Sequence, residues 1–396
     1  MNDQVYSPTR TLMGPGPSDV HPRVLQAMAS PVIGHLDPVF LQIMNGTMDM
    51  LRKVFGTENQ LTVPMSGTGS SGMETLFVNL IEPGDKVVIG VNGLFGQRMV
   101  DVAARVGAEV IQVTAPWGQP LDPAEIEQAL KQHGQVKAVG VVHAETSTGV
   151  RQPLEPIGEL AHRYGALFLV DAVTSLGGIP VEVDRVGIDA CYSGTQKCLS
   201  VPPGLSPVTF NQEAVKVLGE RKGIVQSWYL DLTMIQRYWG AERFYHHTAP
   251  ISMIYALREG LALILEEGLE QVYARHRLNG EALQAGLIGM GLKLLVDEQY
   301  RLPELTSVLV PEEVQDVEVR KRLLQLYNIE IGGGLGELKG KIWRVGLMGH
   351  TCRRRNVLTF LSALEDILIQ LGYRTENGSG IREALRVYQA AGGVTI

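Results

Sequence analysis

The sequence has few cysteines, a modest share of charged residues and no long apolar run. Its three cysteines, Cys191, Cys198 and Cys352, cannot make a disulfide framework, and no metal-ligand spacing links them, so no metal site is expected. The net charge of −7 argues against a nucleic-acid partner. No stretch reaches the ~18 uninterrupted apolar residues of a membrane span, and the first residues lack the basic and apolar regions of a secretion signal. These absences favour a cytoplasmic protein.

Apolar residues make up 45% of the chain, which also contains 45 glycines. Its 396 residues exceed the roughly 250–300 at which a single core stops growing, so we expect two domains. In the first half, short apolar runs alternate with segments of helical periodicity, which indicates an α/β domain with a mostly parallel sheet. The expected strands are 61–63, 86–90, 109–114, 136–142, 167–170 and 206–210, and the expected helices are 97–107, 122–133 and 155–165.

The order of elements changes after a long helix that we expect near 250–269. A smaller α+β domain is predicted from helices near 272–290, 315–326 and 354–371 and from strands near 292–296, 306–310 and 342–345. Residues 375–380 are polar and contain glycine, which is typical of a linker before a short tail. The expected division is an N-terminal arm (1–20), a large domain (21–255), a small C-terminal domain (256–374), and a linker and tail (375–396).

Lys197 and Asp171 are the most informative pair of residues in the chain. Lys197 lies in the small, polar segment 192–200, and Asp171 directly follows the apolar run 166–170. Pyridoxal 5′-phosphate needs an amine for a Schiff base and a carboxylate for its pyridinium nitrogen, and this pair supplies both. Taken singly, Lys197 also fits a solvated loop, and Asp171 also fits a structural pair with an arginine.

The segment Ser66-Gly-Thr-Gly-Ser-Ser-Gly72 follows a strand-like run and precedes a helix that we expect to begin near Met73. Its glycines let the backbone approach an anion, and the helix N-terminus offers unpaired N–H groups, so the segment predicts a phosphate site. The same glycines fit a dinucleotide pattern, but no acidic residue closes the next strand, since Asp85 lies before it. An NAD site and a purely structural turn stay as alternatives.

Eight ordered motifs together resemble the class V, fold-type I aminotransferases, which include alanine–glyoxylate and serine–pyruvate aminotransferases. The resemblance runs from residue 12 to about residue 372, and its motifs are 66–70, 92–98, 143–149, 171–175, 193–197, 245–248, 330–336 and 344–347. It implies a large domain with a mostly parallel seven-stranded sheet, a smaller C-terminal α+β domain, pyridoxal 5′-phosphate as cofactor, and a homodimer with shared active sites.

The resemblance also implies a role for each matching residue. Lys197 would form the internal aldimine and then act as general base and acid, while Asp171 would keep the ring nitrogen protonated. Thr146 would bond the 3-oxygen of the ring, and Phe95 would stack on the ring where many relatives have tryptophan. The residues that would hold the phosphate are Thr68, Gly69, Ser70 and Gln196, joined by Tyr245 and Thr248 of the neighbouring subunit.

Two further residues would contact the substrate. Arg344 would clamp its carboxylate with two parallel hydrogen bonds, and Gly16 would form part of a close backbone wall. A strand-edge ion pair is the alternative for Arg344, and a surface loop is the alternative for 245–248.

We therefore expect transamination from alanine or serine to glyoxylate, which gives glycine and a 2-oxo acid by a ping-pong mechanism. The alternatives are a serine–pyruvate, ureidoglycine–glyoxylate or phosphonate-type aminotransferase and, from another class, a pyridoxal-phosphate lyase or desulfurase. His35 argues against the ureidoglycine enzyme, where glutamine is typical at this position. No thiol lies near residue 330, where a desulfurase needs one, and Cys198 is interpreted as a packed small residue.

Overall fold

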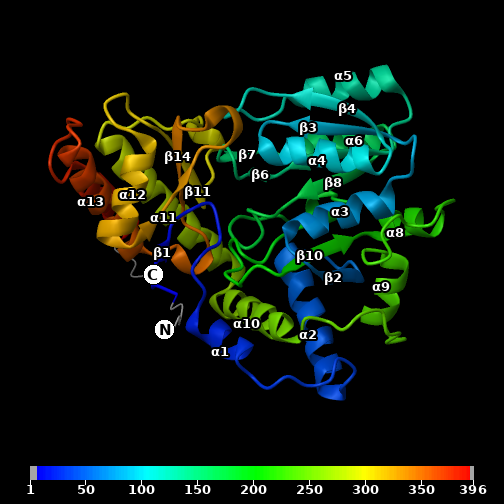
Figure 1. The fold of residues 1–396 in the computed structure, drawn as a ribbon. Coiled ribbons are helices and arrows are strands. Elements are labelled where there is room, and N and C mark those ends of the chain that lie inside the picture. Colours follow the sequence, from blue (N-terminus) through cyan, green and yellow to red (C-terminus); the bar gives the residue numbers. More distant parts are fainter. Residues whose placement is uncertain (1–6, 393–396) are drawn as a thin grey trace, which may run out of the picture.

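A seven-stranded sheet forms the core of the larger part of the protein in the computed structural model, which describes residues 7–392 (Figure 1). Four successive strand pairs are parallel, and only β10 runs antiparallel to its neighbours, which confirms the mostly parallel sheet. In spatial order the strands are β2 (Leu61–Ser66), β10 (Leu205–Phe210), β9 (Ala190–Tyr192), β8 (Leu167–Asp171), β5 (Ala138–Val142), β3 (Lys86–Val91) and β4 (Glu109–Thr114). All the strands were expected except β9, which is only three residues long.

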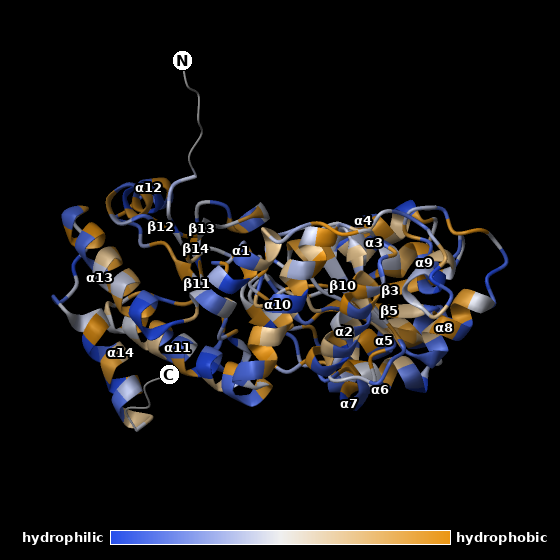
Figure 2. Cartoon of the chain, turned by 90° about the horizontal axis from the view of Figure 1, so that it is seen from below, coloured by the Kyte–Doolittle hydropathy of each residue, from blue (hydrophilic) through white to orange (hydrophobic). Residues whose placement is uncertain are grey.

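Helices cover both faces of this sheet, which explains why its strands read as apolar runs rather than alternating ones. One face carries α3 (Gly69–Leu80) and α4 (Leu94–Arg105), and the other carries α5 (Pro123–His133) and α6 (Glu155–Arg163) (Figure 2). Around the β2 and β10 side lie α2 (Pro38–Phe55), α8 (Gln212–Gly219), α9 (Leu232–Trp239) and the long α10 (Ile251–Glu267). A short hairpin, β6 (Ala144–Glu145) and β7 (Val150–Arg151), and the four-residue α7 (Val183–Val186) complete this part.

The smaller part is built on an antiparallel sheet in the order β11 (Leu305–Leu309), β14 (Ile342–Gly346) and β13 (Gly332–Gly333). Its helices are α11 (Leu269–Gly289), α12 (Asp316–Tyr327), α13 (Arg354–Gln370) and α14 (Ser379–Ala390). The arm joins this part, because β1 (Thr11–Leu12) pairs in parallel with β12 (Ile329–Glu330). Three short 3-10 turns lie at Glu298–Tyr300, Gly336–Leu338 and Gly349–Thr351, of which the last is called η3 below.

Two of the predicted C-terminal features differ from the structure. The strand predicted at 292–296 is absent, because this segment pairs with β11 only through a single bridge between Leu294 and Val308. The expected tail contains the helix α14, which packs on α11 and buries Ala384 and Tyr388. Its start is fixed by Glu365, whose carboxylate accepts hydrogen bonds from the backbone N–H groups of Gly378 and Gly380.

Two N-terminal helices are not among the predicted elements, although the signal for one of them is present. Helix α2 starts with Pro38, and Asp37 accepts a hydrogen bond from Val39 N at 2.8 Å, which is a standard helix start. The other is α1 (Pro22–Met28). The domain division stays a prediction, and its boundary at 255/256 falls inside α10.

Candidate active site

Lys197 lies just beyond the carboxyl end of β9 and is buried, with 8% of its surface exposed. Its Nζ contacts the carbonyl oxygen of Pro15, so the N-terminal arm closes directly over the lysine. Burial, helped by the positive charge of Arg344, lowers the pKa of Lys197 to about 8. A lysine with this pKa supplies free amine near neutral pH, which is what a nucleophile and base needs.

Gly16 explains how the arm can come so close. Its φ is +102°, and a Cβ at this position would lie 2.7 Å from Cδ of Lys197. Only glycine accepts both the backbone conformation and the contact. The structure thus places Gly16 against the lysine, and its contact with a substrate stays a prediction.

Asp171 ends β8 at the same edge of the sheet. Its Oδ1 accepts a hydrogen bond from Val173 N at 2.8 Å, and its Oδ2 accepts one from the Tyr192 hydroxyl at 2.5 Å. Burial raises the pKa of Asp171 to about 6, and the two hydrogen bonds limit the rise. No structural arginine pairs with this carboxylate among residues 7–392, which removes the alternative interpretation. Tyr192 was missed as a site residue, although it opens the segment that was singled out around Lys197.

The predicted phosphate site lies where two loops touch. Thr68 is the N-cap of α3 and makes no side-chain capping bond, which leaves the helix start available to an anion. The loops touch at Gly69 and Gly194. A Cβ on Gly69 would lie 3.7 Å from Gly194 Cα, and a Cβ on Gly194 would lie 3.5 Å from Gly69 Cα. The Oε1 atom of Gln196 is buried in this region and has no hydrogen-bond partner among the described residues. Ser70 follows in the first turn of α3.

Glu145 organises the neighbouring wall and was also missed from the sequence. Its buried carboxylate accepts hydrogen bonds from Phe95 N at 3.1 Å, from Gly96 N at 3.3 Å, and from Ser147 N and Oγ at 3.0 and 2.6 Å. These bonds fix the start of α4, where Phe95 lies. The Arg98 guanidinium covers one face of the Phe95 ring at 5.0 Å, so only the other face is left for stacking.

Arg344 lies on β14, the central strand of the small sheet, and not at a strand edge. Its Nε donates to Gly333 O at 2.8 Å, and its Nη1 donates to Thr146 O at 3.1 Å. Burial lowers the pKa of Arg344 to about 10. Within residues 7–392 no carboxylate forms an ion pair with it, so the strand-edge ion pair expected as its alternative is not found. The Thr146 hydroxyl contacts the hydroxyl of Thr174.

Tyr245 and Thr248 lie on the loop between α9 and α10. Tyr245 is 52% exposed, and its hydroxyl lies 3.4 Å from Thr248 Oγ1. The loop is anchored beside the phosphate site, because His247 Nε2 lies 2.8 Å from Ser66 Oγ. Their contact with the phosphate of a second subunit stays a prediction.

A family model described as aminotransferase class-V matches residues 12–353, which is most of the chain. The chain belongs to the class V aminotransferases. Their cofactor is pyridoxal 5′-phosphate, as predicted. The described residues suit it, since the unpaired Gln196 Oε1 and the open start of α3 lie together, and the carboxylate of Asp171 and the amine of Lys197 share one edge of the sheet.

Three similar proteins match this chain over most of its length. The (S)-ureidoglycine–glyoxylate transaminase of Bacillus subtilis is 43% identical over 98% of each chain. The alanine–glyoxylate aminotransferase of the mouse is 44% identical over 91% of this chain and 88% of its own length. The crystal structure of an alanine–glyoxylate aminotransferase from Nostoc sp. is 50% identical, covers 93% of this chain and 97% of its own, and superposes with a TM-score of 0.91. The fold-type I assignment is confirmed by this likeness.

Residues 7–392 contain no helix that is long and apolar enough to cross a membrane. The same range holds no cluster of three or more His, Cys, Asp or Glu side chains arranged to hold a metal ion. Cys198 is buried and donates weakly to Thr174 O at 3.3 Å, which agrees with its interpretation as a packed small residue.

Proposed function

We propose that this class V aminotransferase transfers an amino group from alanine or serine to glyoxylate by a ping-pong mechanism. Relatives named for two different donors, alanine and ureidoglycine, share glyoxylate as the partner in their names. The names of the relatives therefore agree on glyoxylate as one substrate but differ in the amino donor.

Bound pyridoxal 5′-phosphate supplies an electron sink for the α-carbon of the substrate. Lys197 would provide the amine that holds the cofactor, and its lowered pKa favours a free Nζ that can accept and return a proton. Asp171 would hold a proton on the ring nitrogen as long as its own carboxylate stays ionised. Thr68, Gly69, Ser70 and Gln196 bind the phosphate, while Thr146 and the free face of Phe95 orient the ring.

Arg344 carries the proposal, because it is a buried guanidinium that lacks a carboxylate partner in the described chain. A buried charge without a counter-ion is costly unless a ligand supplies one. Amino acids and 2-oxo acids both carry a carboxylate, and guanidinium binds this group in a planar, two-bond geometry. The same arginine then serves the donor and the acceptor in turn.

A small donor side chain is supported by the close walls of the site. A Cβ on Gly332 would lie 2.5 Å from Cδ of Pro15, so the arm and β13 meet without room for a side chain. Both segments contact the region of Lys197 and Arg344. Alanine and serine fit such walls better than a bulky donor.

A second candidate donor is ureidoglycine, which rests on the 43% identity to the Bacillus subtilis enzyme over almost the whole chain. We place it second because His35 stands where glutamine is typical of that activity. In the structure the His35 ring lies 5.0 Å from the ring of Tyr245, a residue that we assign to the phosphate of the partner subunit. His35 would then lie at the entrance of the shared active site.

We also propose a homodimer, in which Tyr245 and Thr248 would reach the phosphate of a second subunit, as the family resemblance implies. Apolar side chains near them are unusually exposed, at 61% for Trp228, 43% for Tyr229 and 48% for Phe244. Such a patch is typical of a surface that another chain covers. Equilibrium sedimentation measures the state, and a stable monomer with full activity would exclude the shared site.

The function is tested by measuring kcat/KM for alanine, serine and ureidoglycine, each with glyoxylate and with pyruvate as acceptor. The proposal predicts the highest values for alanine or serine with glyoxylate. A higher value for ureidoglycine would reverse the order of the two candidates. Preference for pyruvate as acceptor would contradict the assignment of glyoxylate.

A further inference from the structure

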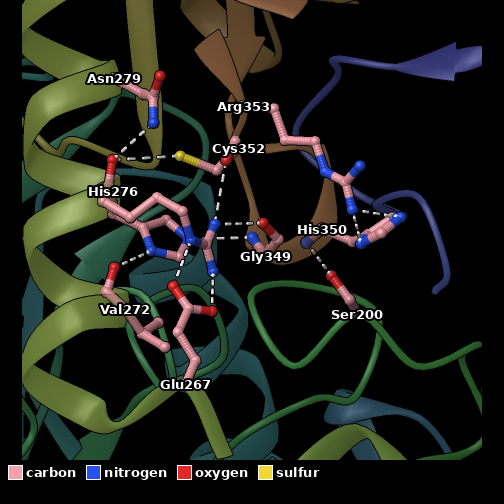
Figure 3. Close-up of polar contacts among 10 residues, drawn as sticks. Ser200, Glu267, Val272, His276, Asn279, Gly349, His350, Cys352 and Arg353 are labelled. Carbon is pink, nitrogen blue, oxygen red and sulfur yellow. Dashed lines mark hydrogen bonds and ion pairs between the residues drawn. The ribbon is translucent and has the colours of Figure 1, made fainter. Parts of the chain in front are cut away.

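The 3-10 turn η3 packs directly on the backbone that follows Lys197. A Cβ built on Gly349, which has a φ of +51°, would lie 2.0 Å from Ser200 Oγ and 2.5 Å from Cys198 O. No side chain fits between the two segments, so glycine is required here. The backbone N–H of His350 donates a 2.7 Å hydrogen bond to Ser200 Oγ and links the turn to the lysine segment (Figure 3).

The N-terminal arm enters the same junction. Ser18 Oγ donates to the carbonyl oxygen of Lys197 at 2.7 Å and lies 3.3 Å from Ser200 Oγ. Asp19 N donates to Thr351 Oγ1 of the turn at 2.9 Å. A connected set of hydrogen bonds therefore links the arm, the lysine segment and the turn. Because of these bonds, a displacement of the turn would also displace the backbone of Lys197.

His276 on α11 holds the turn from the other side. It is fully buried, and its Nδ1 lies 2.8 Å from Val272 O, which can only accept, so the proton is on Nδ1. Nε2 is then free to accept the 3.0 Å hydrogen bond from Gly349 N (Figure 3). Burial lowers the pKa of His276 to about 3, and the ring keeps this neutral acceptor form at working pH.

The guanidinium of Arg275 also binds the turn. Its Nη1 donates to Gly349 O at 2.9 Å and to Cys352 O at 3.0 Å. Glu267 fixes the guanidinium through bonds of 2.6 and 2.9 Å to Nε and Nη2. The turn thus receives one acceptor and two donor contacts from two consecutive residues of one helix.

A cavity of about 690 Å³ adjoins the turn, and Ser200, Arg275, Gly349 and His350 are among its lining residues. Without the contacts from α11 the turn has space to move into. We propose that His276 is a positioning residue for Lys197, which it keeps in place by fixing the turn that bonds to Ser200 and Asp19. This rests on the proposed role of Lys197 as the reactive lysine.

The readout is the pKa of the Lys197 amine in the full-length protein freed of cofactor. It is obtained from the pH dependence of labelling at Lys197 by an amine-reactive reagent and peptide mass spectrometry. Arg344, Asp171, Glu145 and Cys198 are the charged or titratable groups that face this amine, and none of them changes in the variants. In His276→Ala we expect the pKa of Lys197 to rise by about one unit toward its ordinary value, because water reaches the amine.

Three further variants make the test specific. His276→Gln restores an acceptor for Gly349 N and should return the pKa of Lys197 most of the way to that of the wild type. Leu283→Ala removes a fully buried core side chain about two turns further along the same helix, and should leave this pKa unchanged despite its loss of stability. Ser18→Ala breaks the junction from the arm and should raise the pKa as His276→Ala does, which keeps the test usable if one variant folds poorly.

An unchanged pKa of Lys197 in folded His276→Ala would overturn the proposal, whatever Ser18→Ala shows, and so would an equal shift in Leu283→Ala. Because the measurement uses protein without cofactor, it does not depend on which lysine the cofactor joins. Mapping of the cofactor-bearing lysine after reduction answers that separate question.

Discussion

The Tyr192 hydroxyl donates a 2.5 Å hydrogen bond to Asp171 Oδ2 from the neighbouring parallel strand, where the two residues are register partners. Register partners on adjacent strands point to the same face, so the sheet itself brings this donor to the carboxylate. The bond favours the ionised form of Asp171 and offsets part of the effect of burial. It thereby helps the carboxylate to stay negative, as its proposed role opposite the cofactor nitrogen requires.

Tyr192→Phe should lower kcat by about 10- to 100-fold, since a hydrogen bond to a charged group contributes about 1.5–3 kcal/mol. Without the hydroxyl the pKa of Asp171 rises further, and the carboxyl competes for the proton that the ring nitrogen needs. Steady-state kinetics at pH 7 to 8 measure the loss. Tyr238→Phe, which removes a hydroxyl from a buried tyrosine on α9, is the control and should keep its rate. Equal rates in the two variants would exclude the role of Tyr192.

Asp171→Asn should retain the cofactor but lower turnover by several orders of magnitude, because a neutral amide cannot hold the ring nitrogen protonated. The same change should stabilise the cofactor-free protein above pH 6. The pKa of Asp171 is about 6 in the folded chain against an ordinary 3.8, so its stabilising contribution below pH 3.8 is lost as the pH rises through 6. The gain for asparagine is at most about 3 kcal/mol. Thermal melting against pH measures it, and a destabilised variant would argue for a structural role.

Glu304, which has no proposed role in catalysis, gives a second prediction about the pH dependence of stability. It is fully buried, and neither carboxylate oxygen has a hydrogen-bond partner among residues 7–392. Burial raises its pKa from 4.5 to about 8, so stability present below pH 4.5 is lost as the pH rises through 8. Glu304→Gln should flatten the fall of Tm over this interval in protein without cofactor. The exposed Glu298→Gln is the matched control, and an unaltered slope in Glu304→Gln would show that Glu304 is not the cause.

Arg344→Ala should cost about 2–5 kcal/mol of substrate binding in both half-reactions, because donor and acceptor place a carboxylate at the same guanidinium. Arg344→Lys should recover only part, since an ammonium cannot make the two parallel bonds. We would compare kcat/KM for alanine and for glyoxylate with the absorbance of the bound cofactor, which should stay normal. Arg322→Ala, on the surface of α12, serves as control. An unaltered alanine half-reaction would assign the carboxylate to another cation.

Much of this site could be predicted from the sequence, because its signals are local. Lys197 follows a polar turn, Asp171 ends an apolar strand, and the glycine-rich segment 66–72 runs into a helix, which begins at Gly69 and not near Met73 as expected. Tyr192 and Glu145 were missed because their roles depend on which strands and loops become neighbours. His276 lies in a helical pattern like any core residue, and only its distance to the turn reveals a function.

The fold, too, was predicted well where the signal is local and less well where it depends on tertiary neighbours. Long, periodic segments such as α10 and α13 lie within a few residues of their predicted bounds. The predicted strand at 292–296 has a suitable apolar pattern but pairs only once, because pairing depends on tertiary neighbours. Helix α14 lies in the segment predicted as a tail. Its few apolar residues stabilise a helix only when they are buried against α11.

Reduction of the cofactor-loaded protein with borohydride, followed by peptide mass spectrometry, tests the central assignment most directly. We predict that the pyridoxyl group is found on the peptide that contains Lys197, and that Lys197→Ala shows neither this adduct nor transamination between alanine and glyoxylate. Attachment to a different lysine, with transamination intact in Lys197→Ala, would contradict the account.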